Sequence, residues 1–199
     1  MNFTFPAFVD LENKPALVIG ADAMAKQRTE VLRASGARVT VVAEEPESLS
    51  GYFIVISTLT NKRANERLFQ EAERLNILFS AHDDPAHCRF VFPSLHKSGD
   101  LSVAVSTNGK CPALAVRVRQ QVQEDFGPGY GEFLKLAAEM RPHIAAQIGE
   151  FSQRSALWYK MVDSAAIPLL AEGKRKEAER VLGRILAEER VDYPIAAFA

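Results

Sequence analysis

Short apolar runs alternate with amphipathic stretches through the first eighty residues of the chain. Four apolar runs are typical of β-strands, namely residues 15–19, 37–43, 52–58 and 76–81, and the third of them is typical of a buried parallel strand. Between them, residues 24–35 and 61–75 have the three- to four-residue apolar spacing of helices. This alternation of strand and helix predicts an α/β domain with a doubly wound parallel sheet.

The link between the second and third runs, residues 44–51, is short, polar and rich in turn-forming residues. A right-handed crossover between neighbouring parallel strands needs about a dozen residues or more, usually including a helix. We therefore expect these two strands to lie on opposite sides of the first strand in the sheet.

After the fourth run the pattern changes. Residues 90–94 and 101–106 predict an antiparallel pair around a turn at residues 97–100. Pro112 suits the first turn of a helix, and we expect residues 126–131, with their three glycines, to break that helix.

The rest of the chain is predicted to be helical. The helices are expected at residues 132–149, from residue 152 with an interruption at Pro168, and at residues 174–190. The predicted organisation is a shortened Rossmann-like domain at 1–88, a small α+β region at 89–126 and a helical C-terminal domain at 127–199.

Composition narrows the function classes. The formal net charge is −1, from 24 basic and 25 acidic residues, so no global basic field predicts a nucleic-acid partner. Two cysteines, Cys88 and Cys111, are too few for a disulfide framework or a four-thiolate zinc site. No secretory signal and no apolar run of roughly 18 residues is present, so we expect a cytoplasmic protein without a membrane span.

A degenerate phosphate loop follows the first apolar run. A dinucleotide loop reads G-x-G-x-x-G/A, and here Gly20 and Ala25 fit while Asp22 replaces the second glycine. Asp22 puts a carboxylate where a diphosphate needs bare backbone amides, which makes NAD binding doubtful. The candidate cofactor-binding residues are Gly20, Ala21, Asp22, Ala23, Met24, Glu44 and Thr58.

Glu44 has two interpretations. It ends the second strand about twenty residues after the loop, where an acidic residue takes the ribose hydroxyls of NAD. With Glu45 and Glu47 beside it, an ordinary acidic turn explains it equally well.

Several motifs downstream of the loop carry a family resemblance. They are Asp83-Asp84-Pro85, the segment FVFPS at residues 90–94, GDLSVAVSTNG at residues 99–109 and PALA at residues 112–115. Together with the loop, they make the chain similar to the siroheme synthase dehydrogenase/ferrochelatase family. The resemblance implies NAD-dependent oxidation of precorrin-2 to sirohydrochlorin, insertion of ferrous iron in some members, and a homodimer whose dimerisation region corresponds to residues 89–126.

The resemblance also assigns roles to residues. Asp83 matches the catalytic aspartate, and a carboxylate base suits both dehydrogenation and chelation because each releases protons. Without the resemblance, Asp83-Asp84-Pro85 is also explained as a turn signal. His82 and His87 either assist with iron or protons or are plain loop histidines.

The tetrapyrrole implied by the resemblance carries eight carboxylates, so its pocket needs cations and hydrogen-bond donors. The candidate substrate-binding residues are Ser106, Thr107, Asn108, Lys110 and Arg117. Lys110 has the best position for an anion, because it lies beside the helix start at Pro112. No metal ligands are assigned.

Two departures from the family pattern affect the nucleotide half. One is Asp22, and the other is a shortened link between Ala43 and Tyr52, where the family has some twenty more residues. They keep two alternatives open: a chelatase that has lost NAD, and a non-enzymatic tetrapyrrole-binding relative.

Overall fold

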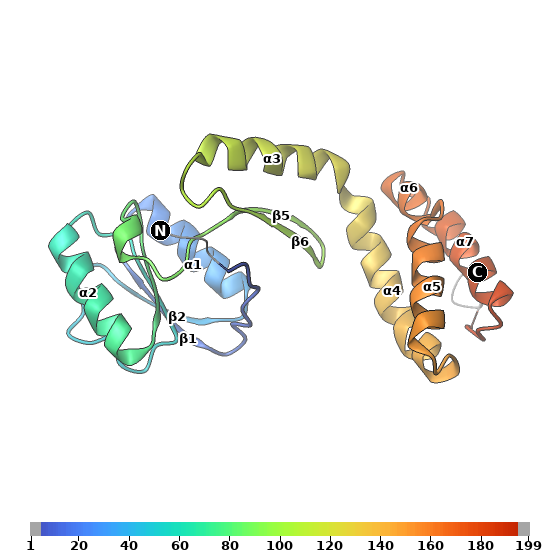
Figure 1. Ribbon diagram of the computed structural model, residues 1–199, viewed down its shortest axis with the longest axis horizontal. Helices are drawn as coiled ribbons and strands as arrows, with labels where there is room; N and C mark the ends of the chain where they lie inside the picture. Colours follow the sequence, from blue (N-terminus) through green and yellow to red (C-terminus); the bar gives the residue numbers. More distant parts are fainter. Residues whose placement is uncertain (1–4, 195–199) are drawn as a thin grey trace. The chain divides into compact units, whose positions relative to one another are not determined.

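The chain divides into two compact units, each described by itself. The structure is a computed structural model in which residues 5–194 are described. Unit 1 contains the residues up to Phe92 together with Asn108–Cys111, and unit 2 contains Pro93–Thr107 and the residues from Pro112 onward. Figure 1 shows the ribbon of both units with labels on several of their helices and strands.

Unit 1 is built on a four-stranded parallel sheet. Its elements in chain order are β1 (Pro15–Ile19), α1 (Ala23–Ala34), β2 (Arg38–Val42), β3 (Ile54–Ser57), α2 (Lys62–Leu75), β4 (Leu78–Ala81) and the short 3-10 helix η1 (Pro85–His87). The strand order is β2-β1-β3-β4. The predicted parallel sheet is confirmed, and so is the placement of β2 and β3 on opposite sides of β1.

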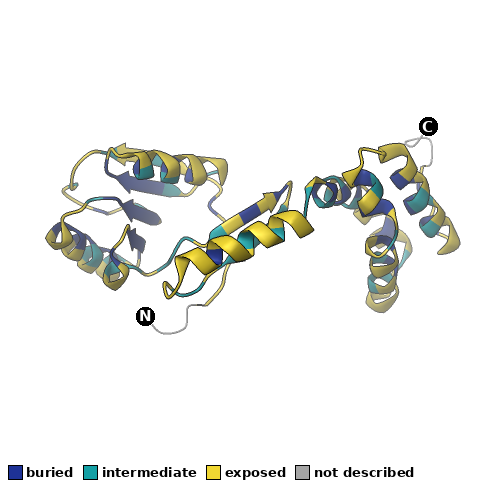
Figure 2. Cartoon of the chain, turned by 90° about the horizontal axis from the view of Figure 1, so that it is seen from above, coloured by how far each residue is buried: buried dark blue, intermediate teal, exposed yellow. Residues whose placement is uncertain are grey.

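One helix covers each face of this sheet, as Figure 2 shows for the buried strands between them. Because side chains alternate along a strand, Leu17 and Ile19 of β1 pack in one cluster with Leu68 of α2. Ala16 and Val18 point the other way, into a cluster with Leu32 of α1. The strands β1, β3 and β4 are therefore buried on both faces. The edge strand β2 has no buried residue.

The short link from β2 to β3 is fixed to α2. Leu49 in this link is fully buried, and its backbone N–H donates to Glu71 Oε1 at 3.1 Å. Ser48 Oγ donates to the same carboxylate oxygen at 3.0 Å. A packed loop thus replaces a crossover helix.

Unit 2 opens with an antiparallel hairpin. It consists of β5 (Ser94–Ser98) and β6 (Leu101–Val105), followed by α3 (Pro112–Asp125). The first predicted strand, residues 90–94, is wrong. The tight turn at Gly99, whose φ is +57°, sets the hairpin register, while Phe90 and Phe92 pack against the core of unit 1.

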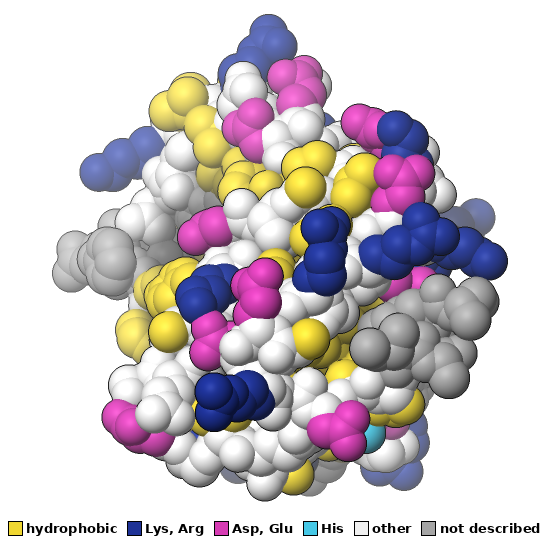
Figure 3. Space-filling model, turned by 90° about the vertical axis from the view of Figure 1, so that its right-hand side faces the viewer, with side chains coloured by type: hydrophobic (Ala, Val, Ile, Leu, Met, Phe, Trp, Pro, Cys, Tyr) yellow, Lys and Arg dark blue, Asp and Glu magenta, His cyan; other side chains and the backbone are white. Residues whose placement is uncertain are grey.

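The helical part of unit 2 contains α4 (Pro128–Gln147), α5 (Phe151–Val162), α6 (Ala166–Ala171) and α7 (Arg175–Glu188). They share one core that includes Leu136, Met140, Leu157 and Leu182. On the face shown in Figure 3, basic and acidic side chains are interspersed. No helix within residues 5–194 is long and apolar enough to cross a membrane.

The predicted break after the Pro112 helix is confirmed at residues 126–127 but is shorter than expected, and the interruption expected at Pro168 is wrong. The break expected at residues 126–131 is too long, because α4 begins at Pro128 and contains Gly129 and Gly131. A Cβ on Gly131 would lie 2.8 Å from the Ser98 carbonyl oxygen, so this glycine permits close packing. Pro168 does not interrupt the helix; it lies in the first turn of α6, where the N–H that proline lacks has no intrahelical partner.

Candidate functional site

The carboxyl edge of the parallel sheet in unit 1 brings three of the predicted loop residues together. Gly20 follows β1 with φ +133°, a conformation that favours glycine. A Cβ at Gly20 would lie 2.0 Å from Thr58 Oγ1, at the end of β3. The first glycine of the loop is therefore required by its conformation and by the approach of Thr58.

Asp22 is the N-cap of α1. Its Oδ1 accepts a hydrogen bond from the backbone N–H of Ala25 at 2.7 Å and one from Thr58 Oγ1 at 3.0 Å. The hydrogen bond from the Ala25 amide is the main cause that lowers the pKa of Asp22; burial opposes it, and the hydrogen bond from the Thr58 hydroxyl lowers the pKa further. The position that admits the pyrophosphate in a dinucleotide loop thus holds a carboxylate that is hydrogen-bonded within the chain.

The other predicted cofactor residues surround this loop in sequence. Ala21 is exposed, and Ala23 and Met24 are the first residues of α1. Glu44 is exposed two residues after β2, and its neighbour Glu45 pairs with Arg67. The structure places Gly20, Asp22 and Thr58 in direct contact, and it gives no such contact for Glu44.

The loop between β1 and α1 can accommodate a dinucleotide if the cap on α1 is given up. The strand end, the left-handed Gly20 and the N-terminus of α1 are the parts that such a site uses. Asp22 is an exposed residue, so its side chain can rotate away and release the Ala25 amide. The cost is the helix cap, which is worth about 1 kcal/mol.

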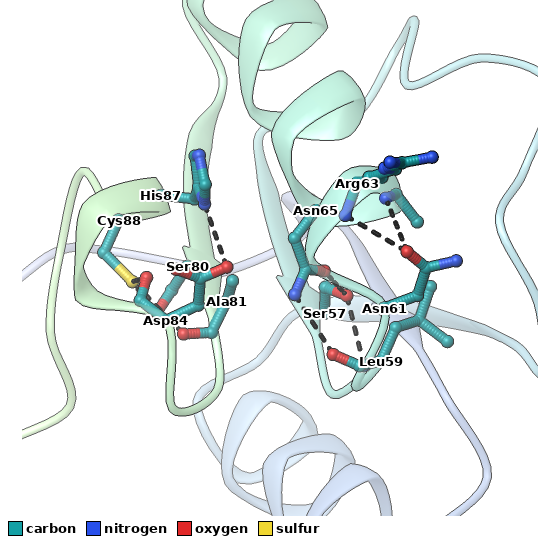
Figure 4. Close-up of polar contacts among 11 residues, drawn as sticks. Ser57, Leu59, Asn61, Arg63, Asn65, Ser80, Ala81, Asp84, His87 and Cys88 are labelled. Atoms are coloured by element: carbon teal, nitrogen blue, oxygen red, sulfur yellow. Dashed lines mark hydrogen bonds and ion pairs between the residues drawn. The ribbon is translucent and has the colours of Figure 1, made fainter.

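A polar network that the sequence analysis missed fixes the β3–α2 connection (Figure 4). Ser57 Oγ donates to Asn65 Oδ1 at 2.7 Å, and Asn65 Nδ2 donates to the Leu59 carbonyl oxygen at 3.1 Å. Asn61 Oδ1 caps α2 by accepting from the Arg63 N–H at 3.1 Å. The network holds the turn that contains Thr58. The only signal of this network in the sequence was an asparagine before a helical run.

Asp83 lies two residues after β4 and is turned toward solvent. Its φ is +55°, a conformation that aspartate tolerates better than most residues. Its side chain is 91% exposed, and Oδ2 lies 3.7 Å from Nε2 of His82. A carboxylate in this position is free to meet a ligand at the carboxyl edge of the sheet.

Asp84 has the opposite environment. Its side chain is 9% exposed, and Oδ2 pairs with His87 Nδ1 at 2.9 Å (Figure 4). Cys88 Sγ donates to the Ala81 carbonyl oxygen at 3.2 Å and closes the same loop. From the sequence, His87 was expected to be an assisting or a plain loop histidine, and this pair was not predicted. Its sequence signal is an aspartate directly before Pro85 and a histidine three residues after that aspartate.

The candidates for the tetrapyrrole are divided between the units. Ser106 and Thr107 follow β6 in unit 2, whereas Asn108 and Lys110 belong to unit 1. Arg117 is exposed on α3, where its Nη1 donates to Gln120 Oε1 at 3.3 Å. Their role in substrate binding stays a prediction. Within residues 5–194, no group of three or more His, Cys, Asp or Glu side chains is arranged to hold a metal ion.

Three family models match the chain in succession. A model described as NAD(P)-binding matches residues 7–94, the sirohaem biosynthesis protein central model matches residues 98–124, and the sirohaem synthase dimerisation region matches residues 129–186. The family resemblance placed dimerisation at residues 89–126, before the segment that carries this description. Which segment joins two protomers stays a prediction.

Curated proteins with similar sequences are siroheme synthases. Siroheme synthase of Photorhabdus laumondii is 28% identical over 96% of this chain and 45% of the relative. Siroheme synthase of Photobacterium profundum is 29% identical over 89% of this chain and 42% of the relative. The chain thus spans less than half the length of these relatives.

A solved structure described as SirC, precorrin-2 dehydrogenase, has the same fold. It superposes with a TM-score of 0.71 at 18% identity, covering 91% of this chain and all of that one. The predicted fold class, a Rossmann-like parallel sheet followed by a small α+β region and helices, is confirmed. Three consecutive family models, described as NAD(P)-binding, central and dimerisation regions, and the siroheme synthases among its relatives confirm that the chain is similar to the siroheme synthase family.

Proposed function

We propose that the chain oxidises precorrin-2 to sirohydrochlorin with NAD. The observation that carries this proposal is the exposed carboxylate of Asp83 at the carboxyl edge of a sheet whose first strand leads into a dinucleotide-type loop. The names of the solved structure and of the curated relatives support it.

The reaction removes a hydride and a proton from the tetrapyrrole. Bound NAD would supply the hydride acceptor. Asp83 takes the proton and passes it to solvent, which its exposure allows. The hydride and the proton together account for the two electrons and two hydrogens that the substrate loses.

The residues of the loop hold the cofactor in this proposal. Gly20 lets the backbone turn toward the diphosphate, and the amides at the start of α1, from Ala23 to Ala25, bind its oxygens. Glu44 takes the ribose hydroxyls at the end of β2, and Thr58 supports the loop from β3.

The tetrapyrrole carboxylates are bound by donors from the segment after β6 and from α3. Ser106, Thr107 and Asn108 donate hydrogen bonds, and Lys110 and Arg117 supply charge. We also propose that the protein acts as a cytoplasmic homodimer, which the match to a dimerisation region supports.

Anaerobic incubation of the purified chain with precorrin-2 and NAD tests the function. We expect NADH and sirohydrochlorin to form in equal amounts. The formation of each is measured through its own absorbance band. Omission of NAD serves as the control. Tetrapyrrole binding without NADH formation would overturn the dehydrogenase proposal.

A second candidate is insertion of ferrous iron, as substrate, into sirohydrochlorin. The capping of α1 by Asp22 favours it, because chelation needs no nucleotide. In that reaction Asp83 accepts pyrrole protons as the metal enters. Anaerobic sirohydrochlorin with ferrous iron and no NAD tests it, and a rate equal to that without protein would exclude it.

A further inference from the structure

We propose that Asp22 is a built-in anion that competes with the pyrophosphate of NAD for the N-terminus of α1 and so sets the affinity of this chain for the cofactor. The inference rests on the proposed function for the identity of the ligand. It concerns a residue that opposes binding, whereas the proposed function concerns residues that assist it.

The competition follows from shared hydrogen-bond donors. A helix N-terminus attracts anions through its free amides and its dipole, and in a dinucleotide loop the pyrophosphate takes this position. Here Asp22 Oδ1 already accepts from the Ala25 N–H at 2.7 Å. Thr58 Oγ1, which reaches over from β3, adds a second donor to the same oxygen at 3.0 Å.

Charge makes the competition stronger than a simple shortage of donors. A diphosphate that approaches the loop meets a carboxylate whose charged form is stabilised by these two bonds, and like charges at close range repel. The Asp22 side chain is nevertheless exposed, so it can swing out. The structure therefore supports weakened binding rather than a blocked site.

Three variants separate the effect of the Asp22 charge on NAD binding from the effect of the shape of its side chain. Asp22→Gly removes the carboxylate and restores the loop pattern, while glycine remains an acceptable N-cap residue. Asp22→Asn keeps a capping oxygen and removes only the charge. Glu30→Gln is the matched control, because it removes one negative charge from an exposed position of α1 two turns beyond the loop.

Calorimetric titration with NAD⁺ measures the effect without turnover. We expect Asp22→Gly to lower the Kd by about tenfold and Asp22→Asn by about threefold, with no change for Glu30→Gln. Thermal unfolding checks that each variant is folded. If Asp22→Gly fails to fold, the Kd of Asp22→Asn for NAD⁺ is compared with that of Glu30→Gln, and this comparison decides the result.

The outcomes separate this inference from the proposed function. NAD⁺ binding that is measurable and equal in the parent chain and Asp22→Gly overturns the inference and leaves the function standing. Binding by Asp22→Gly alone supports the inference and overturns the NAD-dependent function of the parent chain. Lack of binding by both at millimolar NAD⁺ overturns both proposals.

Discussion

Two exposed aspartates at the same sheet edge differ in their hydrogen bonding. Asp22 follows β1, and its carboxylate accepts two hydrogen bonds from its own chain. Asp83 follows β4, and its side chain is 91% exposed. The comparison teaches that an aspartate at a strand end is a structural or a reactive group according to the donors that the following turn provides.

Local backbone explains the difference. Asp22 has an extended backbone with φ −79°, which directs its side chain back to the third residue of a twelve-residue helix. At β4 the short helix η1 follows, and its N-cap residue Asp84 turns inward to His87. Because Asp84 satisfies the inner partner, Asp83 is left to face outward.

The largest effect that tests this comparison is on activity. Asp83→Asn should lower turnover of precorrin-2 by about 10²- to 10⁴-fold, the range expected for losing a general base. Asparagine tolerates the left-handed conformation of this position, so the free energy of unfolding should stay the same. Initial rates and urea denaturation measure the two quantities.

The control for this variant is Asp100→Asn, which removes an exposed carboxylate from the hairpin turn of unit 2. It should leave turnover unchanged. Full turnover by Asp83→Asn would contradict the catalytic assignment and would favour the interpretation of Asp83-Asp84-Pro85 as a turn.

The next effect is on stability. Asp84→Ala should lower the free energy of unfolding by about 1–3 kcal/mol, because it leaves His87 without its buried partner. The matched change is His82→Ala, which breaks the exposed 3.7 Å contact with Asp83 and should alter stability by no more than about 0.5 kcal/mol. Equal losses in urea denaturation would show that burial does not distinguish the two pairs.

The sequence predicted the parallel sheet because each signal there is local. The apolar runs, the helical spacing of residues 61–75 and the short link between β2 and β3 each depend on neighbouring residues. The helix break at residues 126–131 was predicted too long for a nonlocal reason. Gly131 is helical because it packs against the backbone of Ser98, thirty-three positions earlier, which no local pattern reveals.

The residues of the candidate site also fall into those that local sequence patterns indicate and those that only the folded structure brings together. Gly20 and Asp22 were singled out from the spacing of the loop after the first strand, and Asp83 from the family resemblance. The sequence could not predict that Thr58 would reach Asp22, because this contact depends on how β3 lies beside β1. It also could not predict that Ser57 would bond to Asn65, because this contact depends on how α2 returns against the end of β3. Strand pairing decides which polar side chains meet.

The smallest effect concerns the cap on α1. Asp22→Ala should lower the free energy of unfolding by about 1 kcal/mol, and Asp22→Gly by only a few tenths, because glycine is a better N-cap than alanine. Urea denaturation near neutral pH measures both. If Asp22→Ala lowered the free energy of unfolding as much as Asp84→Ala does, the Asp22 carboxylate would contribute more to stability than a surface helix cap.

The charge of Asp22 also predicts a pH dependence. Folding lowers the pKa of Asp22 below its ordinary value of 3.8, so the folded protein binds this proton less readily than the unfolded chain does. The stabilisation is present above the unfolded pKa and is lost as the pH falls through the folded pKa. Asp22→Asn keeps the cap without a titrating group, so the stability difference between the parent chain and this variant should stay constant from about pH 5 to 7 and change in favour of the variant below about pH 4. A difference that is flat down to pH 2 would mean that the Ala25 and Thr58 bonds do not distinguish the charged from the neutral carboxyl group.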